Sequence, residues 1–148
     1  MKALLPTRAS NATIINIPAG SVNLPTKMLA PVGQSGYSIS KLATIKLIEH
    51  IAAENPDLSA VSVYPGIIET ALFDKGGMGV PKEMCDTLEL PADYCVWLAG
   101  AGKEVKCLSG RFVWANWDVL ELIARREEID GSEMLTANIV GWPFVPGP

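Results

Sequence analysis

The sequence predicts an α/β fold in which helices cover a parallel sheet. Three short apolar runs are predicted as strands, at about residues 12–17, 60–64 and 111–115, and a segment with helical character follows each of them. Such alternation is typical of right-handed crossovers, which make neighbouring strands parallel. The chain has 148 residues, of which 49% are hydrophobic and 19% charged. It can therefore bury a sizeable core as a single domain.

The first strand, 12–17, is rich in β-branched residues and is closed by Pro18, as expected for a buried strand of a parallel sheet. A loop rich in Pro, Gly and Ser follows. Residues 37–54 are predicted as a helix that ends at Asn55-Pro56. Its apolar residues recur mostly at three- and four-residue steps and predict one wide stripe: Ile39, Leu42, Ala43, Leu47, Ile48 and Ile51.

The second strand, 60–64, is closed by Pro65-Gly66. The stretch from Glu69 to about Glu89 has no clean period, and we expect a loop with short helices there. Residues 91–101 are predicted as a helix with Pro91 in its first turn.

The third strand, 111–115, is followed by a helix-start pattern. Asp118 is the expected N-cap, with Glu121 three residues later in the position of a capping box. A helix to about Arg126 should follow, and the proline-rich tail 141–148 is expected to be irregular.

Composition excludes several classes of protein. The net charge of −4, with no run of Lys and Arg, argues against a nucleic-acid binder. No apolar run approaches the roughly 18–20 residues that cross a bilayer, so no membrane partner is expected. The single histidine, His50, has no partners for a metal site, and none is expected. The three cysteines match neither a zinc site nor a redox pair, which indicates structural thiols in a reducing, cytoplasmic location.

A tyrosine and a lysine at the start of the long helix are the most informative pair. Tyr37 and Lys41 are four residues apart, so they lie one above the other on one helix face. A cation within about 4–6 Å of a phenol can lower its pKa by roughly 1–3 units. Such a tyrosine can exchange a proton with an alcohol or carbonyl oxygen near neutral pH. Alone, the spacing occurs by chance in many helices, and its context between two strands gives it weight.

With these segments the chain resembles the short-chain dehydrogenase/reductase family. The matching motifs are Ile14-Ile15-Asn16-Ile17, Tyr37-Ser38-Ile39-Ser40-Lys41 and Tyr64-Pro65-Gly66-Ile67-Ile68-Glu69-Thr70. The closing segment 110–118 is similar to a version found in a fungal branch of the family. The resemblance implies a partial Rossmann fold: residues 1–148 would be a single partial domain, the C-terminal half of a doubly wound parallel sheet, with about three parallel strands.

The resemblance also implies roles for individual residues. Tyr37 would be the general acid/base of hydride transfer between a nicotinamide cofactor, NADP or NAD, and a small alcohol or carbonyl substrate. Lys41 would hold the nicotinamide ribose and keep the tyrosine acidic. The residues that would approach the nicotinamide and its carboxamide are Pro65, Gly66, Ile68 and Thr70. A backbone without Cβ at Gly66 can come close to a ligand. The loop 71–89 would cover the substrate.

One departure from the family pattern concerns its catalytic serine. The family usually has Asn-hydrophobic-Ser-Ser, whereas this chain has Asn16-Ile17-Pro18-Ala19. Ser21, two residues later, would substitute if the loop shifts, and a plain turn serine is the alternative.

The second departure concerns the cofactor. No G-x-G-x-x-G precedes a helix, so we expect the N-terminal cofactor-binding half to be absent and residues 1–148 alone to be inactive as an oxidoreductase and poorly soluble or oligomeric. The rival interpretation is a truncated, catalytically silent binding or dimerisation module. The family also implies a homo-oligomer through the helix that carries Tyr37, although its apolar stripe could equally face the sheet.

Overall fold

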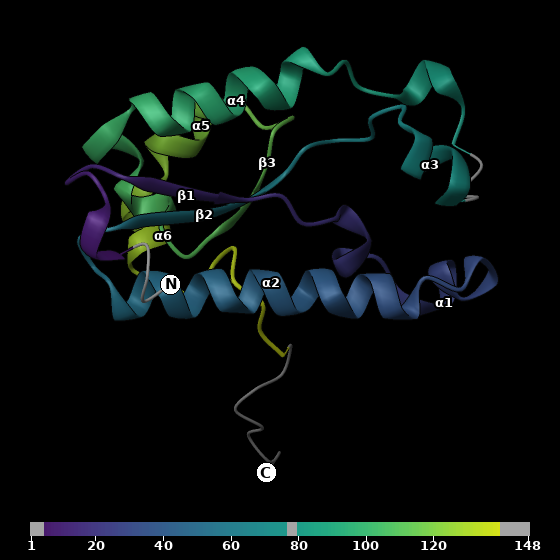
Figure 1. Cartoon of the computed structure of the whole chain (residues 1–148), viewed down its shortest axis with the longest axis horizontal. Coiled ribbons are helices and arrows are strands. Elements are labelled where there is room, and N and C mark those ends of the chain that lie inside the picture. Colours follow the sequence, from purple (N-terminus) through teal and green to yellow (C-terminus); the bar gives the residue numbers. More distant parts are fainter. Residues whose placement is uncertain (1–4, 77–79, 140–148) are drawn as a thin grey trace, which may run out of the picture.

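The computed structural model describes residues 5–76 and 80–139, which form one open, three-stranded parallel sheet with helices on both faces (Figure 1). The strands are β1 (Thr13–Asn16), β2 (Ser59–Tyr64) and β3 (Phe112–Trp114), in the spatial order β1-β2-β3. Thr13 pairs with Ser59, and Ser62 pairs with Phe112. The predicted α/β class and three parallel strands, consistent with a partial Rossmann fold, are confirmed.

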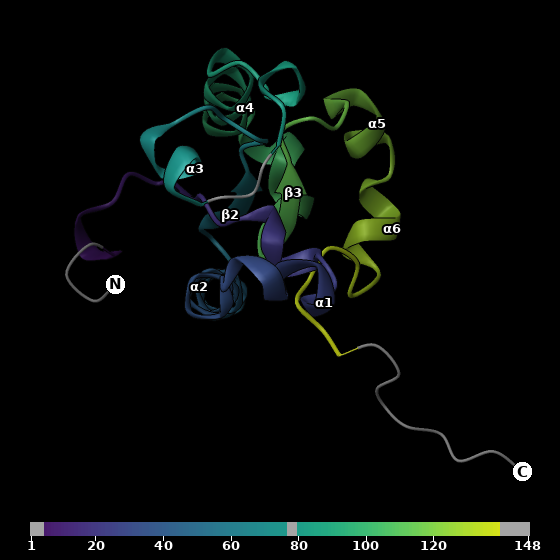
Figure 2. The ribbon, with the colours of Figure 1, turned by 90° about the vertical axis from the view of Figure 1, so that its right-hand side faces the viewer.

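Helix α2 (Ser35–Glu54) packs on one face of the sheet and α4 (Glu89–Gly100) lies over the other, as Figures 1 and 2 show. Both predicted helices are confirmed, and each begins two residues earlier than expected. The segment before α2, expected as a loop, contains short turns of helix: η2 (Gly20–Asn23), α1 (Thr26–Leu29) and η3 (Ala30–Val32). A further 3₁₀ turn, η1 (Leu5–Thr7), precedes β1.

The segment after β2 has the short helices that its lack of period predicted, α3 (Ala71–Gly76) and η4 (Lys82–Met84). A 3₁₀ stretch, η5 (Gly102–Leu108), joins α4 to β3. The helix predicted to run to residue 126 is instead two short ones, α5 (Val119–Ala124) and α6 (Arg126–Asp130), because the chain leaves helical geometry at Arg125. The tail 141–148 lies outside the described residues.

The cap of α5 follows the sequence pattern. One oxygen of the Asp118 carboxylate accepts hydrogen bonds from the backbone N–H groups of Leu120, at 2.8 Å, and Glu121, at 2.9 Å. Asp118 is thus the N-cap that the pattern predicts, and it satisfies two N–H groups that have no partner within the helix.

The core lies on both faces of β2. Val61 and Val63 face a cluster made with α4, η5, β3 and α6, whereas Ala60 faces α2. The larger cluster includes Leu98, Leu108 and Val113, and the smaller one includes Ile48 and Ile51. A strand buried on both faces is the arrangement of a doubly wound sheet.

The single wide apolar stripe predicted for α2 is wrong. Ile45, Ile48 and Ile51 are buried, whereas Ile39, Leu42 and Leu47 are 67%, 44% and 55% exposed. The sheet covers only one side of the helix, so the predicted set mixed residues from two faces. The outer three form an apolar surface that no described residue covers.

Candidate active site

The candidate site lies where the sheet ends. In a parallel sheet the carboxyl ends of all strands meet at one edge, where ligands bind in open α/β folds. The segments that follow β1 and β2 meet the first turns of α2 there and enclose a pocket of about 620 Å³. All seven residues predicted from the sequence line it: Ser21, Tyr37, Lys41, Pro65, Gly66, Ile68 and Thr70.

Tyr37 and Lys41 take the positions that their spacing predicted. Lys41 Nζ lies 5.7 Å from the centroid of the Tyr37 ring. The ammonium donates a hydrogen bond to the carbonyl oxygen of Ile17, at 3.2 Å, which ties it to the segment after β1. Tyr37 is 39% exposed and faces the pocket. The phenol of Tyr37 and the ammonium group of Lys41 therefore share one wall of the pocket.

Ser21 lines the same pocket. Its side chain is buried, and its Oγ accepts a hydrogen bond from Ser38 Oγ at 3.2 Å. Ala19, at the family's usual serine position, is also buried and lines the same pocket. The 3₁₀ turn η2 thus places Ser21 next to Ser38, the residue that follows Tyr37.

The segment after β2 supplies the opposite wall. Thr70 Oγ1 accepts a hydrogen bond from the backbone N–H of Phe73 at 3.2 Å, so Thr70 both lines the pocket and opens α3. Gly66 has φ of +91°, a left-handed conformation that favours glycine. A Cβ on Gly66 would point at the carboxyl group of Asp86. Glycine is required here by that neighbour and by the backbone angle.

Sequence reasoning missed Asp86, which lies in the stretch without a period. Its Oδ2 accepts a hydrogen bond from the N–H of Ile67 at 2.9 Å, and its Oδ1 accepts one from Asn116 Nδ2 at 2.8 Å. Nothing in the local pattern marks an aspartate 19 residues from its backbone partner.

Sequence reasoning gave Tyr64 no role of its own, yet Tyr64 lines the pocket. The ring meets the edge of Trp114 at 4.5 Å between centroids and lies against Gly20, where a Cβ would be 2.9 Å from its Cζ. Burial, and then the charges of Asp86 and Tyr37, raise the pKa of the Tyr64 phenol. Tyr64 thus keeps its proton in the neutral range.

Asn16 connects the strand to the helix that bears Tyr37. Its Nδ2 donates to Ser62 Oγ at 3.0 Å and to Thr44 Oγ1 at 3.3 Å. Thr44 Oγ1 in turn donates to the carbonyl oxygen of Lys41 at 2.8 Å. The amide therefore helps to set the position of α2 relative to the sheet.

Within residues 5–76 and 80–139, no group of three or more potential metal ligands gathers. None of the helices among those residues combines the length and apolar character needed to cross a membrane. The cysteines Cys85, Cys95 and Cys107 are free thiols.

Comparison with known proteins places this geometry in context. A short chain dehydrogenase/reductase of Claviceps purpurea is 37% identical over 124 residues, which are 77% of this chain and 39% of that protein. One of Aspergillus novofumigatus is 36% identical over 149 residues, or 94% of this chain and 49% of that protein. A short chain dehydrogenase of Emericella variicolor is 35% identical over 142 residues, or 93% and 47%.

No family model and no solved structure matches the chain. The chain spans about half the length of the curated relatives it matches. The similarity nevertheless extends over 77–94% of this chain. The chain therefore belongs to the short-chain dehydrogenase/reductase family, as a segment that corresponds to about half of those relatives.

Proposed function

We propose that this chain carries the catalytic side of an NAD(P)-dependent oxidoreductase that interconverts an alcohol and a carbonyl compound. The proposal depends on one observation: residues from the loop after β1, the start of α2 and the loop after β2 all line the same pocket. Family membership supports an oxidoreductase, while the cofactor, the substrate and the residue roles are ours to propose.

The pocket fits the nicotinamide end of such a cofactor. Its volume lies in the range of roughly 300–1,000 Å³ that is usual for small-molecule sites. Hydroxyl groups of Tyr37 and Thr70 and the ammonium of Lys41 offer hydrogen bonds to ribose and carboxamide groups, and Pro65 and Ile68 offer an apolar surface to a ring. NADP and NAD are both compatible with these groups.

The bound cofactor would supply or accept the hydride. Tyr37 would donate its hydroxyl proton to the carbonyl oxygen in reduction and remove a proton from the alcohol in oxidation. Lys41, held by the Ile17 carbonyl, would stabilise the phenolate that forms. Ser21 would orient the substrate oxygen in place of the family's usual serine, and the segment 71–89 would cover the substrate.

A catalytically silent binding or dimerisation module is the alternative. The buried Ala19 at the usual serine position is the observation that favours it. In that case Tyr37 and Lys41 would take no part in a reaction. Calorimetry of the chain with NADPH and NADH separates the two, because micromolar binding argues against the silent module.

We also propose that copies of the protein associate through α2. Ile39, Leu42 and Leu47 are exposed on the side of the helix away from the sheet. A second copy would bury them. Three free thiols are consistent with a reducing compartment, and we propose a cytoplasmic location on that ground.

The test of the proposed reaction is oxidation of NADPH and NADH with a panel of ketones and aldehydes. The assay uses this chain and a full-length relative with the equivalent tyrosine. Tyr37→Phe keeps the ring and removes the proton, so turnover should fall by about 10²–10⁴-fold, the usual contribution of general acid/base catalysis. Tyr94→Phe, outside the pocket, is the matched control. An unchanged rate with Tyr37→Phe would show that the assignment is wrong.

A further inference from the structure

Asp86 joins three segments at the carboxyl end of the sheet, and two of them, the loop after β2 and the stretch before α4, line the pocket. Besides accepting from Ile67 and Asn116 through its carboxylate, its own N–H donates to the carbonyl oxygen of Ile67 at 2.7 Å. Ile67 belongs to the loop after β2, Asn116 follows β3, and Asp86 lies between η4 and α4. One residue thus fixes the relative positions of all three.

The carboxylate also occupies the space beside Gly66. A Cβ built on Gly66 would overlap Asp86 Oδ2 and lie 2.9 Å from Cγ, well inside normal contact. Gly66 is buried and lines the pocket from its backbone. The backbone of Gly66 and Ile67 therefore lies between the pocket and the Asp86 carboxylate.

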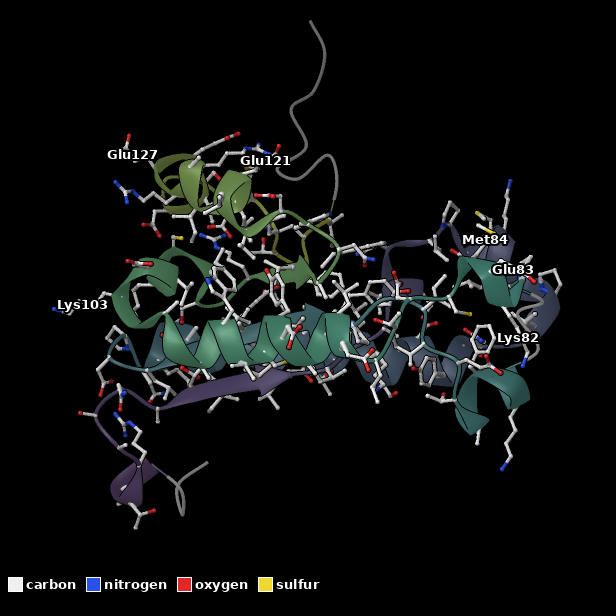
Figure 3. The ribbon with its side chains drawn as sticks, turned by 90° about the horizontal axis from the view of Figure 1, so that it is seen from above. Lys82, Glu83, Met84, Lys103, Glu121 and Glu127 are labelled. Carbon is white, nitrogen blue, oxygen red and sulfur yellow. The ribbon has the colours of Figure 1, made fainter. Side chains whose placement is uncertain are left out.

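The same residue closes the base of the covering segment. Ile68 and Asp86 form a parallel bridge, and Lys82 forms an ion pair with Glu69 nearby. Figure 3 shows Lys82, Glu83 and Met84 at the end of the molecule that carries α3. Phe73, on α3, lines the pocket. The chain that follows η4 thus returns at Asp86 to the loop after β2.

We propose that Asp86 is a positioning residue, which holds the Gly66-Ile67 backbone in its cofactor-facing conformation and joins it to the base of the covering segment. The identity of the ligand rests on the proposed function. The positioning role of Asp86 rests on its hydrogen bonds and on the space that its carboxylate occupies beside Gly66. Asp86 lines no part of the pocket itself, so it acts through the backbone that does.

The first experiment follows hydrogen exchange of the Ile67 amide in the full chain. Asp86→Ala removes the acceptor, and the amide should exchange at least about tenfold faster, since a hydrogen bond to a charged group contributes about 1.5–3 kcal/mol. Asp86→Asn retains an acceptor oxygen and should preserve most of the protection. Glu128→Ala removes an exposed carboxylate paired with Arg125 and should leave the amide unchanged. Equal exchange in wild type and Asp86→Ala would overturn the proposal.

The second experiment is a double-mutant cycle on thermal stability. Gly66→Ala alone should lower Tm because its methyl group meets the carboxylate and its φ is strained. In the Asp86→Ala background the space is free, so the same substitution should cost clearly less. If the Tm losses of the two single variants simply add in the double variant, Gly66 and Asp86 act separately, and the inference is overturned.

Cofactor affinity gives the functional readout. Calorimetry should show NADPH or NADH binding weakened by about tenfold in Asp86→Ala and by less than about threefold in Asp86→Asn. In an active full-length relative, the KM for cofactor should rise more than kcat falls. A wild-type chain that binds neither cofactor would favour the silent module over the proposed function, whereas the exchange and stability results decide the role of Asp86 independently. Normal affinity in a folded Asp86→Ala variant would overturn the positioning role.

Discussion

Replacement of Asn16 by alanine tests how the sheet holds the helix that bears Tyr37. The substitution removes the hydrogen bonds to Ser62 Oγ and Thr44 Oγ1. Each such bond contributes about 0.5–1.5 kcal/mol, and the longer one to Thr44 should lie at the lower end. Ser62 is fully buried, so its hydroxyl would lose its partner in the described structure, at a cost of about 1–3 kcal/mol.

The expected loss of unfolding free energy for Asn16→Ala is thus about 2–4 kcal/mol. At about 2–4 °C per kcal/mol for a chain of this size, Tm should fall by about 4–16 °C. Urea or thermal unfolding followed by circular dichroism measures it. Asn11→Ala makes the same chemical change at an exposed position and should alter stability by less than about 0.5 kcal/mol.

A second variant isolates the buried hydroxyl. Adding Ser62→Ala to Asn16→Ala removes the unsatisfied group, so the double variant should be more stable than the sum of the two single losses predicts, by about 1 kcal/mol or more. A loss below about 0.5 kcal/mol for Asn16→Ala, or strict additivity in the cycle, would refute the reasoning.

Two further predictions concern the core. Leu98 is completely buried in the larger cluster, so Leu98→Ala should destabilise the protein by about 2–5 kcal/mol in urea unfolding, and a loss under about 1 kcal/mol would contradict the packing described. The hydroxyl of Tyr94 is buried with no hydrogen-bond partner among the described residues, so Tyr94→Phe should be neutral or stabilise by about 1 kcal/mol. Burial raises the pKa of Tyr94 above its ordinary value of 10.0. The native state then holds the Tyr94 proton more tightly than the unfolded state, so this contribution to stability is complete below pH 10.0 and declines as the pH rises above it. Over that range the Tyr94→Phe variant should lose less unfolding free energy than the wild type. Plots of unfolding free energy against pH that run parallel for the two proteins would contradict this.

Features that depend on neighbours in sequence could be predicted. The parallel order follows from the alternation of strands with helices. The strand positions, the shared face of Tyr37 and Lys41 and the Asp118 cap follow from short local patterns. Such patterns act within a turn of helix or along a strand, where backbone geometry fixes which side chains are adjacent. The family motifs added the candidate site residues, which lie near one another because parallel strands end at one edge of the sheet.

Features that depend on contacts between distant segments could not. The wide stripe on α2 was wrong because periodicity identifies apolar positions but not which side the sheet covers. The helix after β3 was predicted as continuous, since no strong breaker marks Arg125. The role of Gly66 was predicted from ligand approach, whereas the structure shows the Asp86 carboxylate in the space of its missing side chain.

The sequence by itself determined the α/β class, the three strands and the helix that presents Tyr37 and Lys41, because local spacing encodes them. Only the tertiary structure decided that Ser21 reaches the pocket, that Asn16 joins β1 to β2 and α2, and that Asp86 supports the loop after β2. Asp86 contacts partners 19 and 30 residues away. Contacts at such separations form only when the crossover connections fold back across the sheet, so no local pattern can specify them.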